Sequence, residues 1–279
     1  MLKADIRTLS LPEIERLVDW AATEGWNPGL HDASAFHEAD PGGFIGAFVD
    51  GDMVAGISAV AYGDAFGFIG LYICRPDARG RGHGRAVWDA GMARLAGRTI
   101  GLDGVPAQQA NYRRMGFAPA YETIRYSGRL NGGQAGTGYR IVAVTDDLVG
   151  QAASVDRAHF PAPRAAFLQR WLQPPHKALA CVVDGEVRGF GVARACRSGF
   201  KVGPLFASDD DMAFALLAAV SAGCAGDVHL DVPESRASFI AALVSRGLSP
   251  GFETARMYRG ALHAPAPEGV FGVTTLELG

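Results

Sequence analysis

The sequence predicts an α/β protein with two related domains, and three observations lead to this prediction. Residues 1–130 carry a succession of strand and helix signals, and residues 139–279 repeat parts of that succession. Between them, residues 131–138 hold four glycines and no large apolar side chain, which is typical of a linker. At 279 residues, the chain is long enough for two modest cores. We therefore expect domains at 1–130 and 139–279, joined by the linker 131–138.

Apolar periodicity and turn residues place the elements of the first domain. Ser10 can cap a helix with Pro12 in its first turn, and an Asp-Gly turn at 50–51 predicts a hairpin. The strands that we expect are 44–49, 54–62, 65–74, 98–102 and 122–128, with helices from 86 to 95 and from 108 to 114.

The most informative stretch runs from Ile69 to Ala86. It reads as a buried strand, a stop at Pro76, a glycine-rich turn at 79–84 and then a helix. Such a turn leaves backbone N–H groups free at a helix N-terminus, which favours an anion. The glycines do not fit G-x-G-x-x-G, because Arg85 stands at the third glycine position, and a P-loop lysine is missing.

The stretch instead matches Arg-x-x-Gly-x-Gly, through Arg79, Gly82 and Gly84. It resembles the pyrophosphate-binding loop of the GNAT superfamily of N-acetyltransferases, and Tyr112-x-x-x-Gly116-Phe117 resembles a second feature of that family. The resemblance implies a mixed, mainly antiparallel twisted sheet flanked by helices. It also implies acetyl-CoA as the co-substrate and direct transfer of the acetyl group.

The resemblance also assigns roles to residues. The donor-binding positions are a strand end and the loop after it, namely Tyr72, Ile73, Cys74, Arg79, Gly80, Arg81, Gly82, His83 and Gly84. Tyr112 takes the place of the general acid, since a phenol of ordinary pKa is protonated at neutral pH; the alternative is a tyrosine that only packs on the sheet. Where the family commonly has asparagine, seven residues before the tyrosine, this chain has Val105.

The acceptor side is less defined. Residues 24–32 form a loop that carries Trp26 and several polar groups, and in the resembling family this region contributes to the acceptor pocket. The alternative is a loop that Trp26 packs onto the sheet. The acceptor-binding candidates are Glu24, Asn27, His31 and Asp32. The general base stays open between Asp103, Glu24, His31 and a chain of waters, and some members of the resembling family need no dedicated side chain.

The second half repeats the first in an altered form. Residues 116–128 and 247–260 share a glycine, a proline, a Glu-Thr pair and an arginine, and Leu-Asp at 102–103 recurs at 230–231. The cradle is not repeated, because Asp209, Asp210 and Asp211 stand at the N-terminus of the corresponding helix, and Leu243 replaces the tyrosine. We therefore expect a degenerate GNAT-like domain that serves dimerisation, stability or closure of the acceptor pocket near 24–32.

Composition and charge limit the classes of partner that the protein can bind. A net charge of −3 disfavours nucleic acid, and no apolar run is long enough for a membrane span. The N-terminus has no signal-peptide core, and four cysteines without C-x-x-C spacing suit free thiols in the cytoplasm. We expect no bound metal, and a monomer or homodimer.

These observations predict an acetyl-CoA-dependent N-acetyltransferase, with a tandem arrangement found in bacteria, that acts on a primary amine of a small molecule or peptide. Two alternatives remain. One is a silent acyl-CoA-binding sensor, and the other is an aminoacyl transferase of the tandem-GNAT type, which the acidic pI of 6.2 disfavours.

Overall fold

A computed structural model describes residues 4–130, 138–261 and 268–279. The first half contains β1 (Asp5–Thr8), α1 (Leu11–Thr23), α2 (Asp32–Ala39), β2 (Phe44–Val49), β3 (Asp52–Tyr62), β4 (Phe66–Cys74), the 3₁₀ turn η1 (Pro76–Ala78), α3 (His83–Arg94), β5 (Thr99–Gly104), α4 (Pro106–Arg114) and β6 (Ala118–Gly128). The second half contains β7 (Arg140–Ala143), α5 (Asp146–His159), α6 (Ala165–Trp171), β8 (Lys177–Val183), β9 (Glu186–Ala195), β10 (Phe200–Phe206), α7 (Asp210–Ser221), β11 (Val228–Pro233), α8 (Ala237–Ser245), β12 (Ser249–Arg259) and β13 (Val270–Gly272).

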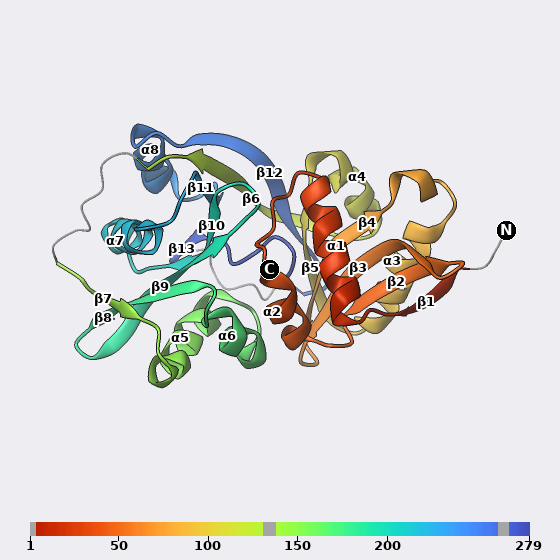
Figure 1. Ribbon diagram of the computed structural model, residues 1–279, viewed down its shortest axis with the longest axis horizontal. Helices are drawn as coiled ribbons and strands as arrows, with labels where there is room; N and C mark the ends of the chain where they lie inside the picture. The colour runs from red at the N-terminus through yellow and green to blue at the C-terminus, as the bar shows by residue number, and fades with distance from the viewer. Residues whose placement is uncertain (1–3, 131–137, 262–267) are drawn as a thin grey trace.

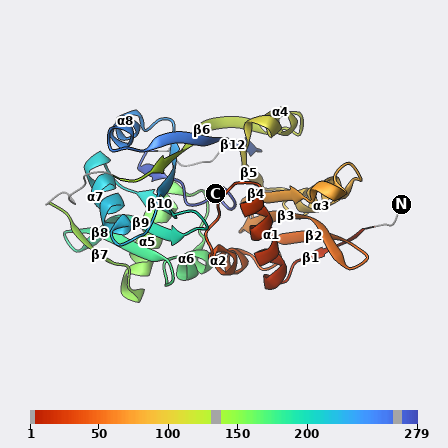
Figure 2. The same ribbon diagram turned by 45° about the horizontal axis from the view of Figure 1, so that its top comes forward.

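The strands of both halves form one continuous sheet. Its order is β1-β2-β3-β4-β5-β12-β6-β11-β10-β9-β8-β7, with β13 paired to β10. The two halves therefore exchange strands: β12 enters the sheet of the first half beside β5, and β6 enters that of the second half beside β11. Figure 2 shows β6 and β12 running side by side from one half to the other. The expected mixed, mainly antiparallel sheet flanked by helices is confirmed, and the two halves share it.

The exchanged strands pair around the repeated Glu-Thr motif. Thr123 faces Thr254 across the ladder, while Glu122 faces Ala255 and Ile124 faces Glu253. Because Glu122-Thr123 corresponds to Glu253-Thr254 in the repeat, the pairing is symmetrical about its own centre. The repeat is thus expressed as a local two-fold relation between β6 and β12.

Two buried ion pairs connect the exchanged strands to the opposite halves. Arg125 of β6 lies in register with Asp231 of β11, and its Nε is 2.7 Å from Asp231 Oδ1. Arg256 of β12 lies in register with Asp103 of β5, with Nε 2.8 Å from Asp103 Oδ1. All four side chains are at least nine-tenths buried. The recurring arginines and aspartates are therefore reciprocal partners, each repeat supplying the arginine that its counterpart's aspartate needs.

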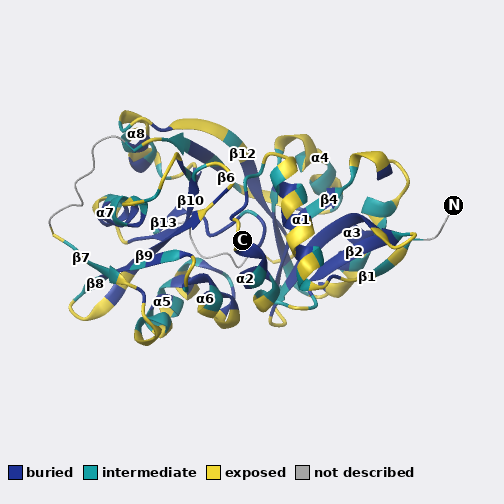
Figure 3. Ribbon diagram, viewed as in Figure 1, coloured by how far each residue is buried: buried dark blue, intermediate teal, exposed yellow. Residues whose placement is uncertain are grey.

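The hydrophobic core extends across both halves. One cluster of buried residues joins Ile14 and Leu17 of α1 to Phe167 and Trp171 of α6, and Phe36 of α2 stacks on Trp171 at 6.1 Å. Separate clusters lie beneath α3 and beneath α7 with α8. In Figure 3 the strands carry most of the buried residues, and the exposed ones gather on helix surfaces and turns. The second half contacts the loop 24–32, where Leu30 N donates to Ala195 O.

Local sequence signals account for most of these elements. Ser10 precedes α1 and donates its N–H to Glu13 Oε2 at 2.8 Å, and Gly82, with φ of +88°, ends the turn before α3. The strand over 44–49 is confirmed to the residue. Short β1, and β13 near the C-terminus, lacked such signals. Of the expected linker, residues 131–137 lie outside the described residues.

Removing one carboxylate of the reciprocal pairs should destabilise the whole chain. Asp231→Ala leaves the Arg125 guanidinium buried without its counter-charge, which should cost about 3–5 kcal/mol of unfolding free energy. Equilibrium denaturation with urea measures this. The matched variant Asp89→Ala breaks the exposed Arg85–Asp89 pair and should be nearly neutral. A loss for Asp231→Ala no greater than that of Asp89→Ala would contradict the assigned importance of the pair.

Candidate active site

The site begins where β4 and β5 separate. These strands pair in parallel from Phe66 with Thr99 to Ile69 with Leu102, and β4 then continues to Cys74 without β5 beside it. Leu71 has a φ of +45°, and the β3–β4 register shifts at this point, which marks a bulge. A cavity of about 470 Å³ occupies the opening. It is lined by Glu24, Trp26, Ile69, Gly70, Leu71, Tyr72, Ile73, Cys74, Arg79, Leu102, Asp103, Val105, Gln108, Tyr112, Phe252, Thr254, Leu276 and Glu277.

The glycine-rich loop lies at one end of this cavity. Gly80 and Gly82 have φ of +75° and +88°, and a side chain at either position would meet no described atom within 4 Å, so the loop presents bare backbone to the outside. His83 and Gly84 form the first turn of α3. The helix N-terminus and the exposed Arg81 both contribute positive potential here, which would favour an anion.

Arg79 connects the loop to the acceptor-side loop. Its Nε donates to Cys74 O at 3.0 Å, and its Nη2 lies 2.7 Å from Glu24 Oε1. Glu24 therefore lies in the cavity, as expected of an acceptor-side residue, but its carboxylate is engaged by the arginine of the cradle. The Cys74 thiol is half-buried, and burial raises its pKa, so the thiol is uncharged at neutral pH.

Tyr112 enters the cavity from α4. Its ring stacks on Trp88 at 5.7 Å and meets Phe117 edge-on at 6.2 Å. Burial, with a smaller effect of Tyr72, raises the pKa of Tyr112 to about 12. The phenol is therefore held in its protonated form with its ring packed between Trp88 and Phe117, an arrangement that suits a proton donor. Asp103, one of the candidate bases, has both carboxylate oxygens on Arg256.

The second half supplies part of the lining. Phe252 and Thr254 come from β12, which the strand exchange brings beside β5, and Leu276 and Glu277 come from the C-terminal segment 273–279. Sequence reasoning missed these four residues, because no motif marks them. The one available signal was Glu277 itself, a lone carboxylate in an otherwise uncharged stretch.

Three acceptor-side candidates lie outside the cavity. Asn27 exchanges hydrogen bonds with the backbone of Ser198, at 2.9 and 3.2 Å, and so joins the two halves. His31 is exposed and borders a different hollow, between α1 and α2. Asp32 is fully buried and forms an ion pair with Arg194 of β9. The structure therefore brings Glu24 to the cavity, together with Trp26, but not these three side chains.

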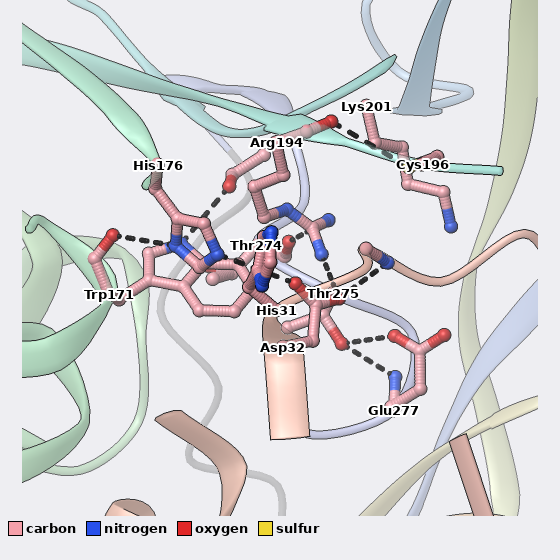
Figure 4. A network of polar contacts seen from close by, with 12 residues as sticks. His31, Asp32, Trp171, His176, Arg194, Cys196, Lys201, Thr274, Thr275 and Glu277 are labelled. Atoms are coloured by element: carbon pink, nitrogen blue, oxygen red, sulfur yellow. Dashed lines mark hydrogen bonds and ion pairs between the residues drawn. The ribbon is translucent and has the colours of Figure 1, made fainter. Parts of the chain in front are cut away.

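Asp32 belongs to a buried network that holds the C-terminal segment (Figure 4). Arg194 reaches Thr274 O at 3.4 Å while it is paired with Asp32, and His176 Nε2 lies 3.7 Å from Asp32 Oδ1. In a second buried pair, Arg164 with Asp156, Arg164 Nη2 donates to Thr274 Oγ1 at 2.7 Å. The network thus fixes the start of the segment that carries Glu277.

The corresponding opening in the second half is filled by the chain itself. There, residues Phe200–Val202 of β10 pair with residues Val228–Leu230 of β11. Beyond Val202, β13 pairs with β10 at Leu205 and Phe206. Val273 N also donates to Asp231 O at 2.9 Å. The N-terminus of α7 is capped by Asp209, whose carboxylate accepts from Met212 N at 2.8 Å. Among the residues that the structure describes, this cleft therefore offers no free strand edge of the kind found at β4.

In the described ranges, no group of three or more His, Cys, Asp or Glu side chains is placed to hold a metal ion. Within the same ranges, no helix combines the length and the apolar character that a membrane span requires.

Models of acetyltransferase (GNAT) sequences match both halves of the chain. A model described as "Acetyltransferase (GNAT) family" matches residues 11–117, and one described as "Acetyltransferase (GNAT) domain" matches residues 152–272. The chain is 33% identical over 277 residues to a holothin acyltransferase from Pseudoalteromonas sp. (strain SANK 73390), covering 97% of this chain and 92% of that protein. It is 24% identical over 207 residues to the uncharacterized N-acetyltransferase YitH of Bacillus subtilis (strain 168), covering 71% of each.

Two solved structures share the fold. A putative acetyltransferase from Pyrococcus horikoshii superposes with a TM-score of 0.82 at 20% identity, covering 100% of this chain and 97% of that one. A tandem GNAT protein from the clavulanic acid biosynthesis pathway gives a TM-score of 0.64 at 14% identity, covering 95% and 100%.

Acidification should weaken the fold through His176. Burial, opposed in part by Asp32, lowers the pKa of His176 from 6.5 to about 4. Between these values the unfolded chain binds more protons than the folded one, so stability falls as the pH drops below about 6.5. Between about pH 7 and 5 this should remove about 2 kcal/mol of unfolding free energy. Urea denaturation of the wild type and His176→Gln at both pH values measures it; equal losses in the two proteins would contradict the assignment.

Proposed function

Because the chain belongs to the GNAT family of acyltransferases, we propose that it transfers an acetyl group from acetyl-CoA to a primary amine of a small molecule. The observation that supports this proposal most strongly is that one cavity is lined by Arg79 of the cradle loop, by the edge of β4 past Ile69 and by Tyr112. These three parts correspond to the three tasks of anchoring the donor, holding its thioester and protonating its leaving thiolate.

The residues present suit acetyl-CoA. Its pyrophosphate is an anion, and the bare backbone at Gly80 and Gly82 with Arg79 and Arg81 can bind it. The amides of its pantetheine arm can pair with the edge of β4 past Ile69, where β5 no longer does so. The bulge at Leu71 interrupts the ladder beside the cavity, and a backbone N–H left without a ladder partner there could polarise a thioester carbonyl.

Tyr112 then completes the transfer. The amine nitrogen attacks the thioester carbon, and the tetrahedral intermediate collapses by breaking the C–S bond. The departing thiolate takes the phenolic proton of Tyr112, which its raised pKa keeps in place at neutral pH. The nitrogen gives up one N–H proton to solvent and a solvent proton restores the phenol, so amine and thioester become amide and thiol.

The lining favours a small acceptor with an apolar or aromatic part. Trp26, Phe252 and Leu276 supply apolar surface, and a volume of about 470 Å³ suits a small molecule better than a folded protein. The relative from Pseudoalteromonas, named as an acyltransferase of holothin, supports a small-molecule acceptor.

A direct assay tests the proposal. Acetyl-CoA is incubated with benzylamine, tryptamine, aniline or glycinamide, and amide and free CoA are measured by mass spectrometry. We expect the enzyme to form the amide of at least one of the three amines that carry an aromatic ring. We expect it to form less amide from glycinamide. Binding of acetyl-CoA without amide from any of these amines would contradict the proposed transfer and favour the silent sensor.

Acetyl-CoA should bind once per chain, and Gly82→Asp should weaken its binding by about 10²-fold. At φ of +88° any side chain is strained, and a carboxylate there repels the pyrophosphate at the helix N-terminus. Calorimetry measures both the affinity and the number of sites. Gly97→Asp is the matched control, since Gly97 has φ of +83° in a turn away from the cavity. Two sites per chain, or equal affinity in the two variants, would contradict the assignment.

Tyr112→Phe should lower kcat by about 10²- to 10⁴-fold, the usual effect of losing a positioned acid. The phenyl ring still stacks on Trp88, so affinity for acetyl-CoA should change by no more than a few-fold. Single-turnover kinetics with the best amine of the panel provide the measurement. Tyr121→Phe removes a hydroxyl that does not line the cavity and should leave kcat unchanged. Wild-type kcat in Tyr112→Phe would make Tyr112 a packing residue.

A further inference from the structure

One carboxylate of the cavity lining, that of Glu277, comes from the second half of the chain. Glu277 lies at 3% exposure in the segment 273–279, and its backbone passes directly over β4. A Cβ on Gly70 would stand 2.0 Å from Glu277 O, so only glycine at position 70 admits the segment. This places Glu277 beside the bulge at Leu71, where the thioester is expected.

The segment is held too firmly for its position to be incidental. Ser58 Oγ donates to Glu277 O at 3.2 Å, and Tyr62 Oη donates to Leu278 O at 3.0 Å. Arg164 Nη1 donates to Gly279 O at 2.8 Å. The carboxylate itself accepts a hydrogen bond at Oε2 from Thr275 Oγ1. The side chain is therefore oriented from within its own segment, as Figure 4 shows.

Three carboxylates line the cavity, and their partners separate them. Glu24 is engaged by Arg79, and both oxygens of Asp103 are engaged by Arg256. Among the described residues, Glu277 makes no ion pair within 4 Å, and its Oε1 accepts no hydrogen bond. Among the described residues that line the cavity, Glu277 is therefore the carboxylate without an arginine partner, and its Oε1 is open to receive a proton.

A second polar group of the same cavity lining lacks a partner within the part of the chain that the structure describes. Thr254 lines the cavity at 3% exposure, and its Oγ1 has no hydrogen-bond partner among the described residues. A buried hydroxyl without a partner is costly, and a polar ligand group would relieve that cost. Glu277 and Thr254 together offer one acceptor and one donor or acceptor to an amino group.

Resting on the proposed function, we propose that Glu277 is the general base of the reaction and that the C-terminal segment thereby completes the active site. As the amine nitrogen forms its bond to the thioester carbon, one N–H proton passes to the Glu277 carboxylate. The C–S bond then breaks, and the thiolate takes its proton from Tyr112. Exchange with solvent returns the proton from Glu277 and reprotonates Tyr112, so amine and thioester become amide and thiol.

Charged groups from several strands surround Glu277. Lys201 of β10, Arg125 of β6 and Asp103 of β5 all act on it electrostatically. Ser58 of β3 and Gly70 of β4 contribute no charge. Any test must therefore separate a proton-transfer role from simple compensation of Lys201 and Arg125.

Glu277→Gln provides that test, because the amide keeps the volume and can still accept from Thr275. With aniline, which is uncharged through the neutral range, kcat should fall by about 10²- to 10⁴-fold. The acid limb of the wild-type pH profile should disappear, and affinity for acetyl-CoA should stay within a few-fold. Glu253→Gln is the matched control, since Glu253 is exposed on β12 next to Thr254 and should behave as the wild type.

Glu277→Asp keeps the negative charge and covers the case in which Glu277→Gln does not fold. We expect it to fold, to retain the acid limb and to lose at least about tenfold in kcat, because its carboxylate is displaced. Wild-type kcat in Glu277→Gln or in Glu277→Asp would overturn the assignment of Glu277 and leave the proposed function standing. Failure of the wild type to acylate any amine of the panel would overturn both.

Discussion

The reciprocal pairs of Arg125 with Asp231 and Arg256 with Asp103 are the interactions on which the rest of the structure depends. Each arginine lies on an exchanged strand, β6 or β12, that pairs with the sheet of the opposite half. Its aspartate lies on the strand of that opposite half with which the exchanged strand pairs. Buried guanidinium and carboxylate groups are costly unless paired, so the pairs set the register in which β6 and β12 lie. That register in turn brings Phe252 and Thr254 to the cavity beside β5.

The second constraint is the stretch 270–279, which consists of β13 and the C-terminal segment 273–279. Its first part, β13, fills the opening between β10 and β11, and its last part borders the opening between β4 and β5. This stretch therefore fills the cleft of the second half and lines the cavity of the first. The two halves differ in this respect although their sequences repeat one pattern. Buried Asp32 and Asp156 contribute to this inequality by neutralising the arginines that hold Thr274.

Local signals allowed the first half to be predicted well, because capping at Ser10, the turn at 50–51 and the cradle at 79–84 act within a few residues. The repeat also predicted a second domain of the same kind. The strand exchange could not be predicted, since each half contains a complete set of strands and only the pairing of Arg125 and Arg256 shows where their strands lie. Asp32, expected at the acceptor side, is instead a buried partner of Arg194, because sequence proximity to Glu24 says nothing of which side a helix N-terminus faces.

Glu277 could not be predicted from the sequence either. Its role follows from a contact with Gly70 more than two hundred residues away, and no spacing in the sequence encodes that contact. The central claim is that both halves build one active site, and a crystal structure of the full chain with acetyl-CoA tests it most directly. We expect one molecule per chain, with its pyrophosphate on residues 79–84, its acetyl group at Leu71 and room for one amino group between the acetyl carbon and the Glu277 carboxylate. Acetyl-CoA in the cleft at β10, or an acetyl group remote from Glu277, would contradict the account.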